Sequence, residues 1–342
     1  MRVLVTGHKG YIGSAMIPSL IKEGYQVVGL DTDFYKSCTF GNSSIEILEI
    51  KKDIRDIIYS DLKDFDAVIH LAALSNDPLG NFNPELTYEI NYKASVNLAR
   101  LARQAGVSRF LFSSSCSLYG AAGDKVMDEN DKFNPITPYG HAKILVENEV
   151  SKLATKDFSP VFLRNTTAYG ISPRLRLDVV LNDLVGWATT TKQIYLKSDG
   201  TPWRPLVHIE DIAVAFIAGL KAPRNLIHNQ AYNVGINEDN YQIKDLANIV
   251  KTTMPDCKIT YAEDAGPDKR SYKVDFSKIK NNLSDFKPQW NVKLGTQHLY
   301  ESFKKIGLSL EEFKGPKFRR IDQINQLIKK GLLDRNLRWI KA

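Results

Sequence analysis

Short apolar runs alternate with amphipathic segments along the first half of the chain. In the first amphipathic segment, apolar residues with helical spacing share one face: Ile12, Met16, Ile17, Leu20 and Ile21. The pattern predicts strands at 2–6, 26–31, 46–50, 66–73, 109–112 and 160–164. Helices are expected between them, including one at 91–104 and one that begins at Pro138. Such alternation is typical of a parallel sheet with helices on both faces.

After about residue 170 the alternation becomes irregular. Helical patterns at 178–190, 212–220 and 242–254 are separated by short strand patterns at 194–196, 232–235 and 258–261. We therefore predict an α/β fold with a Rossmann-type doubly wound parallel sheet and a smaller mixed α/β domain over its carboxyl edge. The expected first domain is 1–170, completed by about 204–236. The second is 171–203 with 237–313, and 314–342 is a tail.

The net charge of the chain is concentrated in this tail. The whole chain has a formal charge of +7, and residues 314–342 contain nine Lys or Arg and two Asp, so the remainder is balanced. Apolar residues at helical spacing give the tail an amphipathic pattern: Ile321, Ile324, Leu327 and Ile328. We expect this helix to dock on the body with its charges in water, and we expect no nucleic-acid or membrane partner.

The overall composition indicates a globular protein, with 43% hydrophobic and 25% charged residues among 342. No run of about eighteen apolar residues is present, so no membrane span is expected. The chain enters a predicted strand at once, which leaves no room for a signal peptide. Cys38, Cys116 and Cys257 are few and scattered, which argues against a disulfide framework and favours a cytoplasmic protein.

A glycine-rich turn links the first predicted strand to the first helix. Gly7, Gly10 and Gly13 follow a G-x-x-G-x-x-G spacing, with Tyr11 and Ile12 at the expected helix start. Glycine permits a tight turn and a close approach of a pyrophosphate to the backbone, and the helix start offers free N–H groups. These five residues are therefore the predicted phosphate site of a dinucleotide.

Further cofactor contacts are expected where the neighbouring strands end. Asp31 ends the second strand, where a carboxylate binds the adenosine ribose hydroxyls and repels a 2′-phosphate, so we predict NAD rather than NADP. The other expected cofactor residues are Asp53 and Ile54 after the third strand, Leu71, Ala72 and Ala73 after the fourth, and Asn91 in the next helix. A simple turn acid is the alternative for Asp53.

The helix that begins at Pro138 contains the predicted reactive groups. Tyr139 and Lys143 lie one turn apart on one face, and a nearby lysine favours tyrosinate, so the tyrosine can act as a base. Ser115, at the serine-rich end of the fifth strand, can orient a substrate oxygen. We predict that these three residues are catalytic and that Tyr139 and Lys143 also contact the cofactor. A solvated Tyr–Lys pair is the alternative, and no metal site is predicted.

Together these motifs resemble those of the extended short-chain dehydrogenase/reductases, specifically the nucleotide-sugar epimerase/dehydratase group. The resemblance covers about residues 1–295, including an Arg204…His208…Asp211 segment. It implies tightly held NAD, a C-terminal domain that closes on a nucleoside-diphosphate sugar, and a homodimer. It also matches Ser115, Tyr139 and Lys143 to the family's catalytic residues. Expected substrate contacts are Ser75, Ser117, Thr167, Arg174, Arg204 and Arg270; for the last two, surface arginines are the alternative.

Several departures from the family pattern bear on the reaction. Thr167 stands where the family often has asparagine. Cys116 and Ser117 stand where 4,6-dehydratases have Asp-Glu, so the carboxylate acid and base for removing water are missing. Arg174 and Arg176 lie where the substrate domain begins, and either contact the nucleotide or face water. The tail beyond about residue 315 matches nothing general to the family.

We therefore expect an NAD-dependent nucleotide-sugar 4-epimerase, an isomerase that works through a transient 4-keto intermediate. The first alternative is an NAD(P)H-dependent nucleotide 4-keto-sugar reductase. A 4,6-dehydratase is disfavoured because the Asp-Glu pair is missing. A non-catalytic nucleotide-sensing protein is disfavoured because both Tyr139 and Lys143 are present.

Overall fold

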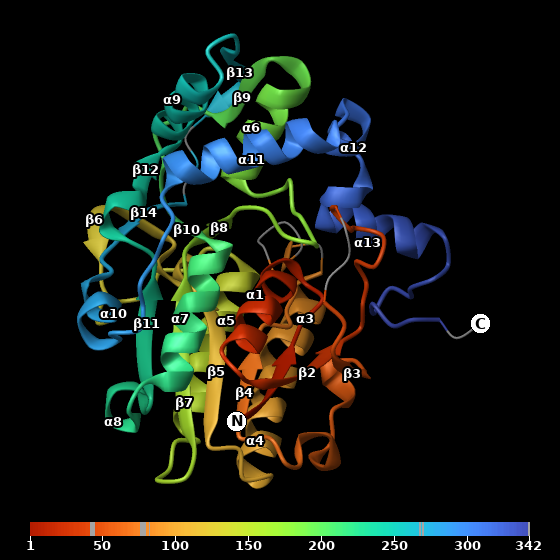
Figure 1. Cartoon of the computed structure of the whole chain (residues 1–342), viewed down its shortest axis with the longest axis vertical. Helices are drawn as coiled ribbons and strands as arrows, with labels where there is room; N and C mark the ends of the chain where they lie inside the picture. The colour runs from red at the N-terminus through yellow and green to blue at the C-terminus, as the bar shows by residue number, and fades with distance from the viewer. Residues whose placement is uncertain (42–44, 76–79, 82, 267, 269, 341–342) are drawn as a thin grey trace.

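A parallel sheet of seven strands forms the base of the molecule (Figure 1). The structure, a computed structural model, describes residues 1–41, 45–75, 80–81, 83–266, 268 and 270–340. The strand order is β11-β7-β5-β4-β1-β2-β3, which confirms the predicted doubly wound sheet. The strands are β1 (Arg2–Thr6), β2 (Gln26–Asp31), β3 (Leu48–Lys51), β4 (Ala67–His70), β5 (Arg109–Ser115), β7 (Ser159–Asn165) and β11 (Gln230–Val234).

Helices cover both faces of this sheet (Figure 1). Val3 and Val5 of β1 point into a core shared with α1 and α7, while Leu4 points into a second core shared with α4 and α5. Because side chains alternate along a strand, the central strands supply both cores, as a sheet buried on two sides requires. The helices are α1 (Tyr11–Lys22), α3 (Pro84–Thr87), the π-helical η3 (Tyr88–Ala94), α4 (Ser95–Gln104), α5 (Pro138–Ser151), α7 (Ile209–Lys221) and α8 (Arg224–Ile227).

A smaller mixed region lies over the carboxyl ends of the strands, at the top of Figure 1. Its core is a third apolar cluster that joins α6, α9 and α11. It contains α6 (Val180–Thr191), α9 (Ile243–Thr253), α11 (Val292–Ile306), β9 (Gln193–Ser198) and β13 (Lys258–Gly266). The helix α10 (Ser277–Asn282) instead lies beside β11, with Ile279 in the first core of the large sheet. Short strands connect the smaller region to the sheet: β6 (Ala121–Met127), β8 (Thr167–Tyr169), β10 (Trp203–His208), β12 (Asn240–Gln242) and β14 (Ser271–Val274).

Short 3-10 turns complete the described body. They are η1 (Ile54–Asp56), η2 (Tyr59–Leu62), η4 (Cys116–Tyr119) and η5 (Asn237–Asp239). Two turns matter for the cavity described below, because η1 and η4 each follow a strand of the large sheet, β3 and β5.

The predicted elements differ from the observed ones mainly in their ends. The helix expected at 91–104 begins earlier, because η3 continues into α4 without a break. The strand expected at 66–73 ends at His70, and the residues after it form a loop. The strands β6, β8, β10, β12 and β14 and the helix α11 were not predicted; β8 and β12 have only three residues each, too few to give a period.

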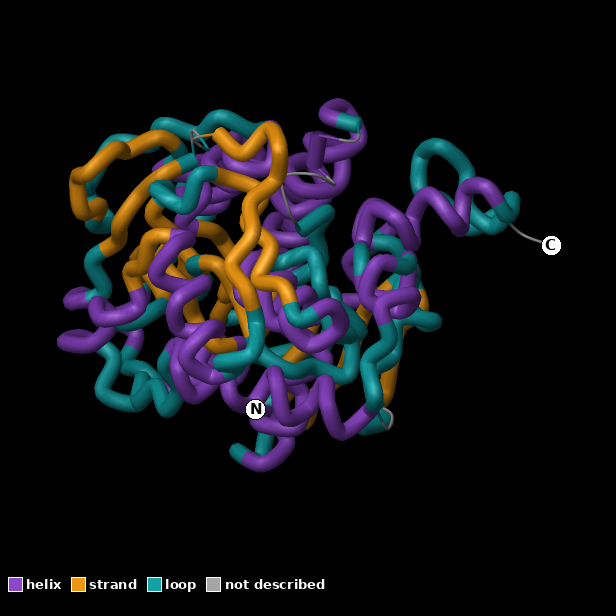
Figure 2. The backbone as a smooth tube through the Cα atoms, turned by 90° about the horizontal axis from the view of Figure 1, so that it is seen from above, coloured by secondary structure: helices purple, strands orange, loops and turns teal. Residues whose placement is uncertain are grey.

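The C-terminal segment packs along one side of the molecule (Figure 2). It contains α12 (Leu310–Lys314), η6 (Pro316–Phe318) and α13 (Arg320–Lys329). Ile324 and Leu327 of α13 are buried in the core of the sheet's second face, as are Leu333 and Leu337 beyond it. The expectation that all tail charges face water is wrong for Arg320, which is 2% exposed.

Within the described residues, none of the helices has both the length and the apolar character needed to cross a membrane. The three cysteines are buried and unpaired.

Candidate active site

A cavity of about 850 Å³ lies between the sheet's carboxyl edge and the smaller region. Its lining includes most of the residues predicted from the sequence. These are Gly7, Gly10, Tyr11, Ile12, Gly13, Asp31, Asp53, Ile54, Leu71, Ala72, Ala73, Ser75, Ser115, Ser117, Tyr139, Lys143, Thr167, Arg204 and Arg270. Two predicted residues, Asn91 and Arg174, do not line it.

The glycine turn brings the start of α1 to this cavity. Gly7 has φ +75°, and a Cβ there would lie 2.7 Å from the backbone nitrogen of Ala72. A Cβ on Gly13 would lie 2.3 Å from the carbonyl oxygen of Gly7, so the turn tolerates no side chain at either position. Gly10 precedes the helix and supplies no capping side chain. The N–H groups of the first turn can therefore bind an anionic group, which fits the diphosphate of NAD.

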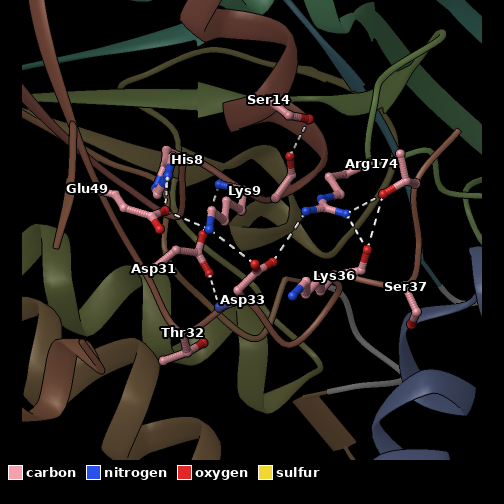
Figure 3. Close-up of polar contacts among 12 residues, drawn as sticks. His8, Lys9, Ser14, Asp31, Thr32, Asp33, Lys36, Ser37, Glu49 and Arg174 are labelled. Carbon is pink, nitrogen blue, oxygen red and sulfur yellow. Dashed lines mark hydrogen bonds and ion pairs between the residues drawn. The ribbon is translucent and has the colours of Figure 1, made fainter. Parts of the chain in front are cut away.

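Asp31 is held in place by the backbone on both sides. Its Oδ2 accepts from the N–H of Lys9 at 2.9 Å, and its Oδ1 accepts from the N–H of Asp33 at 2.8 Å. Burial raises the pKa of Asp31 above its ordinary value. Lys9 does not balance this acid, because its Nζ pairs with Asp33 at 3.1 Å and Glu49 at 2.6 Å (Figure 3). The carboxylates here fit ribose hydroxyl donors and oppose a 2′-phosphate.

Asp53 and Ile54 lie beside Asp31 at the adenosine end of the cavity. Asp53 caps η1 by accepting from the N–H of Arg55 at 2.9 Å, and it pairs with the Arg55 side chain at 2.7 Å. Its carboxylate is therefore engaged in the structure of the turn, while Ile54 is buried and offers an apolar contact. These contacts fit the alternative interpretation, in which Asp53 stabilises a turn instead of binding the cofactor.

Asn91 has a different position from the one predicted. It is 2% exposed in η3, where its Oδ1 accepts from the N–H of Leu74 at 2.8 Å and its Nδ2 donates to the Leu74 carbonyl at 3.0 Å. Asn91 therefore fixes the loop after β4 from behind. That loop includes Ala72, Ala73 and Ser75, which line the cavity.

Arg174 also turns away from the cavity, contrary to the prediction. Its Nη1 donates to the Lys36 carbonyl at 2.7 Å and to Thr39 Oγ1 at 2.6 Å, and its Nη2 lies 3.4 Å from Asp33 (Figure 3). Arg174 thus ties the loop after β2 to the smaller region. Arg176, two residues further on, lines the cavity instead.

The predicted reactive groups lie together at the start of α5. Thr137 caps the helix by accepting from the N–H of Gly140 at 3.2 Å, and Pro138 occupies the first turn. Lys143 Nζ lies 5.5 Å from the ring centre of Tyr139 and donates to the Ser113 carbonyl at 2.5 Å. Tyr139 and Lys143 are therefore not a solvated surface pair, because Lys143 is 3% exposed.

The environment of Lys143 strongly disfavours its charge. Burial lowers the pKa of Lys143 to about 7, and the carboxylate of Glu147 opposes this only in part. Glu147 is already paired with Arg164 at 2.7 Å, so its charge is shared. A lysine with a pKa this low at the edge of a cavity is typical of a functional group.

Serine, threonine and asparagine side chains surround the same end of the cavity. Ser115 Oγ accepts from the N–H of Ser117 at 3.1 Å, and Thr167 lines the cavity from β8. Asn165 Nδ2 donates to Ser113 Oγ at 2.9 Å. Within the described chain, Ser117 Oγ and Asn165 Oδ1 are buried without a hydrogen-bond partner, so both can meet a ligand.

Cys116 is not a reactive group of this cavity. It is fully buried, and burial raises the pKa of its thiol well above the ordinary value. Its Sγ donates to the Arg164 carbonyl at 3.1 Å. The position that holds a carboxylic acid in the 4,6-dehydratases is therefore occupied here by an inert, inward-facing thiol.

Arg204 and Arg270 line the wall that the smaller region supplies, and Asp268 joins them. Asp268 Oδ2 lies 2.7 Å from a guanidinium nitrogen of each arginine. Arg204 also donates to the Trp203 and Arg270 carbonyls. The two arginines are thus one cluster on the cavity rather than separate surface residues, and paired guanidinium groups suit a diphosphate.

Several residues that line the cavity come from distant segments and were not predicted. Phe34 and Tyr35 follow β2, Asp178 precedes α6, and Arg320 begins α13. The sequence contains no local signal for Arg320, because it lies in a segment that resembles nothing general to the family.

The sequence pattern of the NAD dependent epimerase/dehydratase family matches residues 3–235. The UDP-glucose 4-epimerase of Bacillus subtilis (strain 168) is 26% identical over 332 residues, which cover 87% of this chain and 94% of that protein. The UDP-glucuronic acid decarboxylase 1 of Arabidopsis thaliana is also 26% identical, over 92% of this chain and 72% of that protein. The structure of MoeE5 with UDP-glucuronic acid and NAD superimposes with a TM-score of 0.77 at 25% identity, over 90% of this chain and 100% of that one.

Proposed function

Because this chain belongs to the NAD-dependent epimerase/dehydratase family, we propose that it is a nucleotide-sugar 4-epimerase. The observation that supports this best is the arrangement of Ser115, Tyr139 and Lys143 in one cavity with the Arg204–Arg270 cluster. In such a cavity, a nucleotide sugar would find a base for its sugar hydroxyl and cations for its diphosphate. The similarity to UDP-glucose 4-epimerases supports the same reaction.

In the proposed reaction, Tyr139 takes the proton of the sugar 4-hydroxyl. The positive charge of Lys143 favours the tyrosinate needed for this step. Ser115 Oγ holds the sugar oxygen during the transfer. NAD bound in this cavity would supply the hydride acceptor and donor for C4, so the sugar would pass through a 4-keto form without net oxidation. The keto sugar then rotates within the cavity so that hydride returns to the opposite face of C4. Tyr139 gives the proton back to the sugar oxygen.

Two related reactions are less well supported by the residues present. A 4,6-dehydratase needs a carboxylic acid and base after the catalytic Ser/Thr, and Cys116 and Ser117 provide neither. A 4-keto-sugar reductase would use the same three residues but would consume a reduced cofactor in each turnover. The need for added NADH or NADPH therefore separates a reductase from an epimerase.

The test is the interconversion of UDP-, GDP-, CDP- and dTDP-sugars without added reductant, followed by chromatography. Tyr139→Phe should lower turnover by roughly a hundredfold or more, the usual effect of losing a positioned acid–base, and leave NAD bound. Tyr261→Phe, which changes an exposed tyrosine, is the matched control. A folded Tyr139→Phe protein that binds NAD and works at the wild-type rate would disprove this mechanism.

We also propose that the chain forms a homodimer, as the family resemblance implies. Multi-angle light scattering of the purified protein measures the mass directly. A monomer at micromolar concentration would contradict the proposal.

A further inference from the structure

Arg320, the first residue of α13, is a buried arginine in the wall of the cavity. Its Nη2 donates to the Arg174 carbonyl at 2.5 Å, and its guanidinium lies 4.3 Å from the ring centre of Tyr35. Its Nη1 is buried without a hydrogen-bond partner among the described residues. A buried guanidinium nitrogen without an acceptor is costly, so a ligand oxygen at this position would be favourable.

Arg176 is a second buried arginine beside it. Its Nε donates to Asp178 at 2.8 Å and its Nη1 reaches Ser75 Oγ at 3.3 Å, while its Nη2 also has no partner in the described part of the chain. Asp178 serves both arginines, because its Oδ2 also accepts from the backbone N–H of Arg320 at 3.3 Å. Two guanidinium charges against one carboxylate leave a net positive charge in a buried place, which an anion can balance.

The two arginines lie across the start of α1. Asn182 Nδ2 donates both to the Tyr11 hydroxyl at 3.0 Å and to the Arg176 carbonyl at 2.8 Å, and Tyr11 is the first residue of α1. Burial raises the pKa of Tyr11, and the charges of Arg176 and Arg320 act against this, as expected for close neighbours. Arg176 reaches the loop after β4, while Arg320 stacks on the loop after β2.

Arg176 and Arg320 line the same cavity as the residues expected to hold the two ends of NAD. Asp31 marks the adenosine end after β2, and Lys143 marks the reactive end beside β5. A dinucleotide that spans these two residues crosses the glycine turn with its diphosphate. In that case, the nitrogens of Arg176 and Arg320 that lack a partner would face the part of NAD that has two negative charges.

Residues beyond Arg320 lie over the adenosine end. Trp339 Nε1 donates to the Thr32 carbonyl at 2.7 Å, and its ring lies 5.7 Å from that of Phe34. Arg338 lies 3.3 Å from Asp53. Gln323 Nε2 donates to Ser37 Oγ at 2.8 Å. Residues 320–340 thus contact both loops that line this end of the cavity, at the right of Figure 1.

We propose that residues 320–340 form a clasp that retains NAD, with Arg320 and Arg176 binding its diphosphate. The clasp would hold the cofactor through repeated turnovers. The proposal depends on the NAD requirement of the family and not on the 4-epimerase reaction proposed above, since it concerns binding alone.

The test is cofactor binding to purified Arg320→Gln, with Lys330→Gln as the control that removes an exposed charge at the end of the same helix. Calorimetry should show NAD and ADP-ribose binding roughly tenfold to a hundredfold more weakly to Arg320→Gln, the usual effect of a lost charge-assisted hydrogen bond. Adenosine, which has no phosphate, should bind both variants alike. Less NAD should co-purify with Arg320→Gln.

A second variant tests the clasp without changing the buried arginines. Trp339 is 43% exposed, so Trp339→Ala should fold, and it should release NAD several-fold faster after dilution. Two results would overturn the proposal. One is a folded Arg320→Gln protein with wild-type affinity for NAD and ADP-ribose. The other is unchanged NAD binding with weaker UDP-sugar binding, which would place the anion on the substrate. Neither readout depends on turnover.

Discussion

At the residue scale, the most consequential side chain is Lys143, which must be charged for its proposed role but is buried where charge is disfavoured. The cation stabilises tyrosinate, so the low pKa of about 7 means that this stabilisation fades as the pH rises. Burial of Lys143 therefore lowers the stability of the folded protein while it serves the proposed reaction, as is common at functional sites.

This conflict predicts a pH-dependent stability. Between about pH 7 and the ordinary pKa of lysine, the unfolded chain binds one more proton at Lys143 than the folded chain does, so the folded state gains stability as the pH rises. Lys143→Met removes the buried charge and should raise the free energy of unfolding at pH 7, on the order of 1.4 kcal/mol per unit of pKa shift. The difference in the free energy of unfolding between Lys143→Met and the wild type should become smaller toward pH 10.

Urea unfolding at several pH values measures this effect. Lys152→Met, which changes an exposed lysine at the end of the same helix, should show no such trend. A Lys143→Met protein that is less stable than the wild type at pH 7 would contradict the prediction.

Asp31 gives a second prediction at this scale. Its carboxylate is fixed by the N–H groups of Lys9 and Asp33, and the nearby Lys9 is paired with other acids. The wild-type protein should therefore bind NAD much more tightly than NADP. Asp31→Ala should narrow the ratio of the two dissociation constants by roughly tenfold or more, because it removes both an acceptor and a repulsive charge.

Calorimetry with both cofactors gives this ratio. Asp157→Ala, which removes an exposed acid, should leave it unchanged. Equal affinity of the wild-type protein for NAD and NADP would refute the role given to Asp31.

At the element scale, the glycine turn and α13 illustrate two ways in which a helix contributes. The turn acts through its backbone, because a Cβ at Gly7 or Gly13 would collide with neighbouring backbone atoms. α13 acts through its faces: Ile324 and Leu327 enter the sheet's core while Lys329 and Lys330 face water. A basic composition therefore does not identify this segment as a site for polyanions.

Deletion of residues 316–342 should lower the melting temperature by several degrees. It removes buried Ile324, Leu327, Leu333 and Leu337 and leaves their apolar partners exposed. Each such side chain is worth roughly 1.5–3 kcal/mol when fully buried. Differential scanning calorimetry measures the change.

The matched control is the pair Lys329→Gln and Lys330→Gln, which removes charge from the same segment without changing its packing. It should leave the melting temperature unaltered. If the deletion instead left stability unchanged and abolished retention on heparin, the segment would be a polyanion site rather than a packed element.

At the scale of the whole molecule, the sheet and its ligand edge could be predicted because a periodic helical segment separates β1 from β2, β4 from β5, and β5 from β7. The glycine turn, Asp31 and the Tyr139–Lys143 pair were predicted because each signal is local in the sequence. Arg174 was chosen over Arg176 because the segment around them has no period from which side-chain direction follows. Arg320 could not be predicted, since the sequence does not indicate which distant segment meets the cavity.

Arg320 and Tyr35 are in contact in the folded protein but lie far apart in the sequence. This affects the order in which the parts of the cavity form during synthesis. Every strand of the seven-stranded sheet is translated before residue 320, so the sheet can pair while this segment is still inside the ribosome. The guanidinium that meets Tyr35 is added afterwards. Secure retention of the cofactor would thus begin late, and ribosome-bound chains that stop short of residue 320 should form the sheet without keeping NAD.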